Sequence, residues 1–142
     1  MVFQRQITFF CTLALIAFML IAGSTLSANP VDNSIHEKAC SVTAGQRTVT
    51  LNIDPKPVKH MKELTFSVTI SPCDKLPDTL LLDLSMPGME MGKNQVTLVR
   101  KSACLYEGKG IIVRCMSGRT LWQVTILSDE LKNPAFTFNV RE

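Results

Sequence analysis

The segment LTFSVTI, residues 64–70, alternates apolar and polar side chains over its whole length. Successive side chains of a β-strand point to opposite faces, so the apolar members share one face. These members are Leu64, Phe66, Val68 and Ile70. Strict alternation predicts a half-buried strand. The segment therefore indicates an antiparallel sheet with one face on a core and one toward solvent.

Runs of the same kind recur along the rest of the chain, separated by turn residues such as Pro72, Pro77 and Ser117-Gly118. They are TVTLNI (48–53), TLLLDLSM (79–86), QVTLVRK (95–101), LYEGKGIIV (105–113), TLWQVTIL (120–127) and FTFNV (136–140). The run at 105–113 admits a hairpin with its turn at Lys109-Gly110. Residues 128–132, SDELK, predict a helical turn. We expect residues 39–142 to form an all-β domain, an Ig-like antiparallel β-sandwich of about seven strands.

The apolar faces of these strands predict the core. The candidates are Phe66, Leu82, Leu84, Val96, Leu98, Ile112, Trp122, Val124, Ile126, Phe136 and Phe138. Trp122 is the only tryptophan, and we expect it to be a pillar of the core. Stacking over a ligand at one end of the sandwich is its alternative role.

Residues 1–28 predict an export segment. Arg5 gives a short positive start, residues 7–22 are almost wholly apolar, and Ala28 stands at a cleavage position. The apolar run also reaches the roughly 17–20 residues that span a bilayer. Leu26 is an imperfect −3 residue for cleavage, so a cleaved signal peptide and a retained membrane anchor both stay open. Residues 29–38 are polar and predict a linker, and the domain is expected to be periplasmic or otherwise extracytoplasmic.

Charge and motif content argue against two function classes. The 114 residues after Ala28 carry 14 Lys and Arg against 12 Asp and Glu, scattered along the sequence. A nucleic-acid-binding domain needs a basic stripe, which this pattern lacks. The chain has two histidines, His36 and His60, and it has no GxSxG, HExxH or glycine-rich phosphate loop. We therefore expect no enzyme.

The exported part holds four cysteines, Cys40, Cys73, Cys104 and Cys115. An even number in an oxidising compartment indicates two disulfides. The spacings of 33, 31 and 11 residues contain no CxxC, which argues against a redox motif or a zinc knuckle. We expect Cys40–Cys115 with Cys73–Cys104. Cys104–Cys115 is the alternative, because a turn at Lys109-Gly110 would set them opposite each other.

The segment SMPGMEMGKN, residues 85–94, places three methionines around a Pro-Gly pair. Pro87 and Gly88 fit the two central positions of a type II turn, which brings the Cα atoms of Met86 and Met89 within about 7 Å. Met89 and Met91 are two residues apart and share a face in an extended segment. We therefore expect the three sulfurs to converge.

Clustered thioethers form a soft site that is selective for Cu(I) over hard cations. They also suit an oxidising compartment, where thiols tend to end in disulfides. Methionine is equally a flexible filler of cores, and exposed methionines form adaptable contact surfaces. The turn therefore predicts either a copper site or a metal-free interaction module.

Three stretches in this order resemble the YtkA-like/FixH-like family. They are LDLSMPGMEMGKNQVTL (82–98), YEGKGIIV (106–113) and MSGRTLWQVTI (116–126), and the resemblance covers about residues 46–140. The family shows an apolar strand, an MPGM-type turn, a hairpin with Tyr and Gly, and a Met-x-Gly-x-x-Trp strand. The matching positions here are Met86, Met89, Met91, Tyr106, Met116, Gly118 and Trp122.

The resemblance implies a small exported or membrane-anchored β-sandwich domain, similar to periplasmic copper-handling proteins. Its FixH branch is associated with assembly of haem-copper oxidases, which implies a membrane oxidase or a copper-transfer protein as partner, and FixH-type members keep their membrane helix. Met116 is thereby a further ligand candidate, with His60 and Met61 as a supplement.

Two features depart from related copper chaperones. His60 lies 29 residues before Met89, farther than their histidine lies from its MxM motif. The cysteines are not general to the family, so Cys115 either forms a structural disulfide or belongs to the site.

Overall fold

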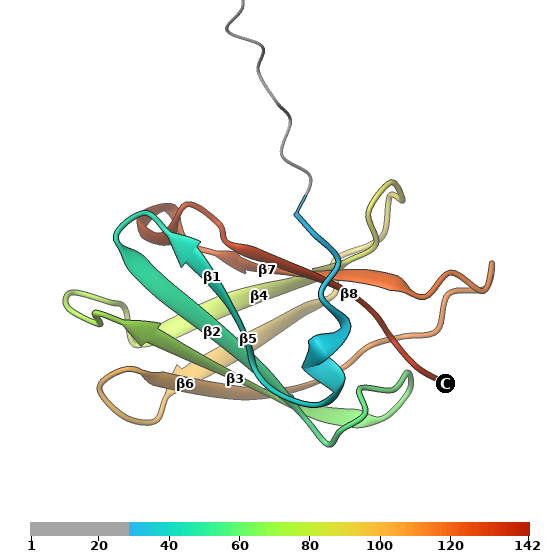
Figure 1. Cartoon of the computed structure of the whole chain (residues 1–142), viewed down its shortest axis with the longest axis horizontal. Coiled ribbons are helices and arrows are strands. Elements are labelled where there is room, and N and C mark those ends of the chain that lie inside the picture. Colours follow the sequence, from blue (N-terminus) through green and yellow to red (C-terminus); the bar gives the residue numbers. More distant parts are fainter. Residues whose placement is uncertain (1–28) are drawn as a thin grey trace, which may run out of the picture.

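The structure is a computed structural model that describes residues 29–142; the predicted signal or anchor lies outside the described residues. Eight antiparallel strands and two short 3-10 helices follow one another along this part of the chain (Figure 1). The strands are β1 (Cys40–Ala44), β2 (Arg47–Asp54), β3 (Glu63–Ser71), β4 (Thr79–Ser85), β5 (Gln95–Arg100), β6 (Leu105–Ile111), β7 (Leu121–Leu127) and β8 (Ala135–Asn139). The helices are η1 (Asn33–His36) and η2 (Asp129–Leu131), the second at the predicted SDELK segment.

The strands form one sheet in the order β1-β2-β3-β6-β5-β4-β7-β8. The sheet curls until its edge strands β1 and β8 approach each other, which gives a sandwich-like, nearly closed body (Figure 1). The all-β antiparallel prediction is confirmed, and each predicted run contains a strand. The additional strand is β1, whose five residues alternate too briefly to stand out in the sequence. Within residues 29–142, no helix has the length and apolar character needed to cross a membrane.

The core lies inside the curled sheet, and every core candidate named above is buried. Leu64, Phe66, Val68 and Ile70 are fully enclosed, as the alternation of the 64–70 segment predicts. Trp122 is also fully buried, which confirms its role as a core pillar. All of these core residues belong to the described part of the chain, residues 29–142. Since a domain with its own core is able to fold alone, we expect residues 29–142 to fold without the preceding segment.

The predicted hairpin at Lys109-Gly110 is wrong. Residues 105–111 form the single strand β6, which pairs with β3 along its whole length and with β5 at two positions. The glycines are needed for close packing rather than for a turn. A Cβ atom on Gly108 would lie against the backbone oxygen of Thr97 and 2.8 Å from Cδ2 of Leu98.

The strand order sends four segments to one end of the body. The β2–β3 loop (55–62), the β4–β5 loop (86–94), the β6–β7 loop (112–120) and the C-terminal residues 140–142 all lie there, at the right of Figure 1. We call this the loop end. The β1–β2, β3–β4, β5–β6 and β7–β8 connections lie at the opposite end.

One disulfide, Cys73–Cys104, joins the β3–β4 loop to the β5–β6 turn at the opposite end, which confirms one predicted bridge. The predicted Cys40–Cys115 bridge is wrong, since both residues are free thiols. Cys40 is buried at the start of β1, with its Sγ 3.3 Å from Oγ of Ser34. The alternative Cys104–Cys115 is also wrong, because the straight strand β6 separates these two residues.

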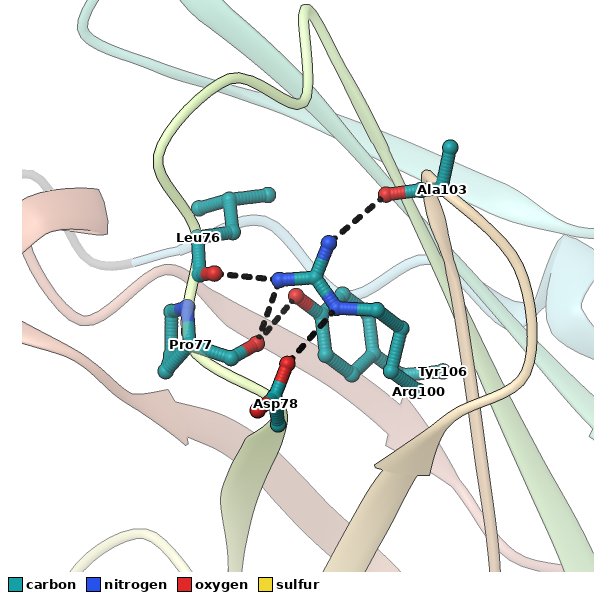
Figure 2. Close-up of polar contacts among 6 residues, drawn as sticks. All are labelled: Leu76, Pro77, Asp78, Arg100, Ala103 and Tyr106. Atoms are coloured by element: carbon teal, nitrogen blue, oxygen red, sulfur yellow. Dashed lines mark hydrogen bonds and ion pairs between the residues drawn. The ribbon is translucent and has the colours of Figure 1, made fainter.

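Arg100 holds the same β3–β4 loop through its side chain (Figure 2). Its guanidinium donates to the carbonyl oxygens of Leu76, Pro77 (2.8 Å) and Ala103 (3.2 Å). The hydroxyl of buried Tyr106 also donates to Pro77 O at 2.6 Å, and the guanidinium carbon lies 5.3 Å from the centre of the Tyr106 ring. Three hydrogen bonds therefore support the β3–β4 loop and a fourth reaches the β5–β6 turn, while the cation–π contact holds the guanidinium on Tyr106.

Residues of the predicted linker pack against the sheet. Val31 forms a parallel bridge with Thr137 of β8, and Ile35 is fully buried. The ring of His36 is held at both nitrogens: Nε2 lies 2.7 Å from Asn139 O, and Nδ1 accepts from the N–H of Val58 at 3.1 Å. This segment therefore covers part of the seam between β8 and β1.

Candidate functional site at the loop end

The methionine-rich turn has the predicted backbone. The N–H of Met89 donates to the carbonyl oxygen of Met86 at 3.0 Å, and Gly88 has a φ of +76°. A positive φ at the third position, after Pro87, is the signature of a type II turn. The turn prediction is therefore confirmed.

The side chains of this turn go to different environments. Met86 is 2% exposed and belongs to the core, as a continuation of the apolar face of β4. Met91 is half-buried and packs against the core, whereas Met89 is 38% exposed. Met86 therefore acts as a core filler, while Met89 and Met91 offer sulfur nearer to solvent.

The β6–β7 loop crosses the methionine-rich turn for a topological reason. Strands β6 and β7 flank the β5-β4 pair in the sheet, so their connection must pass over the end where β4 and β5 join. This brings Cys115 to Met89, with 3.9 Å between Sγ and Sδ. A thiol and a thioether from two separate loops thus meet at the loop end.

Cys115 is a partly exposed free thiol with a hydrogen-bond partner. Its Sγ lies 3.0 Å from Oγ of Ser117, and this hydrogen bond holds the pKa of the Cys115 thiol below its ordinary value, with a smaller contribution from Arg119. A lowered pKa favours the thiolate, which is the form that binds metals. Cys115, predicted from sequence either to form a disulfide or to belong to the site, is a free thiol beside Met89.

Met116 follows Cys115 at the tip of the β6–β7 loop. The N–H of Gly118 donates to the carbonyl oxygen of Cys115 at 3.0 Å, so Met116 is the second residue of a tight turn. Its side chain is fully exposed. Met116 thus lies one residue from the thiol without being fixed by packing.

His60 and Met61 reach the loop end on the β2–β3 loop. The N–H of His60 donates to Arg141 O at 3.1 Å, and that of Met61 donates to Ile112 O at 2.9 Å. Met61 is 62% exposed. His60 is 7% exposed, and neither of its ring nitrogens has a hydrogen-bond partner. Buried polar atoms are almost always paired, so this imidazole is the least satisfied side chain near the site.

The unpaired His60 gives the fold a pH dependence. Burial, and secondly the nearby Arg114, hold its folded-state pKa below the ordinary value of 6.5. The unfolded chain therefore binds the proton first as pH falls, and stability falls with it. We expect the free energy of unfolding to decrease from about pH 6.5 downward until the folded-state pKa is passed.

Urea unfolding of residues 29–142 at a series of pH values measures this dependence. In the His60→Leu variant, the free energy of unfolding should fall less steeply with pH below pH 6.5. His36 is present in both proteins, so the difference belongs to His60. Parallel curves for the parent and the variant would contradict the expectation.

Within the described residues, no three His, Cys, Asp or Glu side chains gather closely enough to hold a metal ion. The loop end does hold thioether, thiol and imidazole groups. The available donors are Cys115, Met89, Met91, Met116, His60 and Met61. Among them, Cys115 and Met89 are in direct sulfur–sulfur contact in the structure.

Comparison with known proteins found no match for this chain. The chain matches no protein-family model, and no similar curated protein or solved structure was found.

Proposed function

We propose that this chain binds Cu(I) at the loop end, with Cys115 and Met89 as the first two ligands, and serves in copper handling outside the cytoplasm. The observation that carries the proposal is the 3.9 Å approach of the thiol and the thioether from two loops. Cu(I) favours such soft ligands, whereas Mg²⁺ and Ca²⁺ favour oxygen.

Further ligands are available around this pair. Met91 follows Met89 by two residues, and Met116 is adjacent to Cys115 and fully exposed. His60 supplies an imidazole that lacks any other partner. Met86 is excluded from the proposed ligand set, because its side chain is enclosed in the core.

The proposal includes the wider setting that the sequence suggests. The domain is placed among YtkA-like/FixH-like β-sandwich domains with Ig-like architecture, exported as a soluble periplasmic protein or held by residues 7–22 as an anchor. The order of the matching motifs and the antiparallel all-β fold support this placement. A membrane oxidase or a copper-transfer protein is the partner class that follows from it.

Anaerobic Cu(I) titration of residues 29–142 against a competing chelator tests the site. We expect Cys115→Ser and the double change Met89→Leu with Met91→Leu each to lower affinity at least about 10-fold, the minimum that loss of even a supporting partner commonly costs. Leucine preserves methionine's volume, so the fold should survive. Cys40→Ser and Met86→Leu are matched controls, because they remove the same sulfur groups from buried side chains outside the proposed ligand set.

Parent-like affinity in both test variants would contradict the copper site. The metal-free interaction module would then be the better account, since the exposed Met61 and Met116 suit a contact surface. Equal losses in the test and control variants would also contradict the assignment, because they would indicate general damage rather than ligand removal.

A further inference from the structure

The loop end gathers exposed apolar side chains from separate loops. Five of the eight large apolar side chains exposed among residues 29–142 lie there. They are Met61, Met89, Ile111, Val113 and Met116. Exposed apolar groups concentrated in one place usually mark an interaction surface.

The same end is basic. Its loops and adjoining strand ends carry eight basic against five acidic residues, while the described residues as a whole carry 14 against 12. The basic residues are Lys56, Lys59, Lys62, Lys93, Lys109, Arg114, Arg119 and Arg141. The acidic residues are Asp54, Glu63, Asp83, Glu90 and Glu142, of which Glu63 is paired with Lys109 at 2.7 Å. Most of the remaining basic side chains are exposed to solvent.

We propose that the loop end binds an anionic lipid surface, with Met61 and Met116 entering the interface and the surrounding basic side chains contacting the headgroups. The two methionines stand on different loops, and Met116 occupies the tip of a turn. Side chains that project singly need no matching pocket in a bilayer. Apolar tips enter the acyl boundary, while Lys and Arg keep their charges at headgroup level.

Charge complementarity identifies the lipid class. Each Lys or Arg near an anionic membrane surface strengthens binding, and the effect fades within a Debye length. A neutral bilayer would offer the methionine tips the same apolar interior without this attraction. The inference is therefore specific to anionic lipids, and it does not depend on copper.

Co-sedimentation of metal-free residues 29–142 with vesicles tests the proposal. We expect binding to a phosphatidylglycerol–phosphatidylcholine mixture, much weaker binding to phosphatidylcholine alone, and loss of binding at high salt. Arg114→Gln with Arg119→Gln should weaken binding about 5-fold for each arginine. Met61→Ser with Met116→Ser should also weaken it, at every salt concentration at which the parent binds.

Two pairs at the opposite end are matched controls. Val99→Ser with Leu127→Ser removes exposed apolar side chains, and Lys75→Gln with Lys101→Gln removes exposed charges. Both pairs should bind like the parent. The vesicle assay uses metal-free protein and keeps Cys115, Met89 and Met91 in every variant, so its failure can be distinguished from failure of the copper titration.

Three results would overturn the proposal. One is binding to the phosphatidylglycerol mixture no stronger than to phosphatidylcholine, which would leave the loop end to a protein partner. Another is parent-like binding by the Met61 and Met116 double variant. The third is a loss in the control pairs as large as in the loop-end pairs.

Discussion

Replacing Gly108 by alanine should lower the free energy of unfolding by about 3 kcal/mol or more, the upper end of the cost of overpacking. The added Cβ would press on the backbone oxygen of Thr97 and would lie 3.1 Å from its carbonyl carbon. Backbone in the neighbouring strand β5 cannot move aside as a flexible side chain does. The clash could be relieved only if strands β5 and β6 moved apart. That movement would disturb the core, which includes Leu98 of β5.

Gly92→Ala is the matched control. A Cβ at Gly92 has no atom within 4 Å, and the backbone there is not in the left-handed region. Alanine also reduces the entropy of the unfolded chain, so this variant should be neutral or up to about 1 kcal/mol more stable. Urea unfolding of both variants measures the difference. A Gly108→Ala protein as stable as Gly92→Ala would show that the two strands do not approach as closely as described.

The same glycine shows where sequence-based prediction of the fold failed. Alternation in residues 64–70 correctly predicted strand β3, because burial on one face is a local pattern. In residues 105–113, glycines that indicated a turn are required by contact with another strand. Their purpose depends on which strand lies alongside β6, and the local sequence does not contain that information.

The candidate site was predictable to a similar extent. Pro87-Gly88 determines a type II turn by local dihedral preferences, and the turn is present. The partner of Met89 depends on the β6–β7 loop crossing that turn, which follows from strand order. Cys115 was therefore assigned to a disulfide, although its sulfur lies beside Met89. Charges that are scattered in the sequence are likewise brought together at the loop end by the topology.

Arg100→Met should lower the free energy of unfolding by about 2 kcal/mol, a typical value for losing hydrogen bonds from a charged donor. Methionine keeps an apolar stem against Tyr106 but leaves the carbonyl oxygens of Leu76, Pro77 and Ala103 without this donor. Water can replace the guanidinium at the exposed positions 77 and 103, which keeps the cost below the sum of three charged hydrogen bonds.

Asp78→Asn is the control for the charge itself. The carboxylate lies 3.5 Å from Nε of Arg100, but its side chain is 97% exposed, so the ion pair should contribute less than about 1 kcal/mol. Urea unfolding with the disulfide intact compares the two variants. Equal losses would assign the effect to the ion pair and contradict the role given to the carbonyl contacts.

Reducing Cys73–Cys104 should make Arg100 more important. With the bridge intact, the β3–β4 loop stays tethered to the β5–β6 turn even when the guanidinium is absent. In the reduced protein, the side-chain hydrogen bonds that hold that loop come from Arg100, the hydroxyl of Tyr106 and Arg47. Groups that fix the same segment are expected to couple by about 0.5–3 kcal/mol, so the cost of Arg100→Met should rise by an amount in this range after reduction. If Arg100→Met lowers the free energy of unfolding by the same amount in the oxidised and the reduced protein, the disulfide and the arginine stabilise the loop independently of each other.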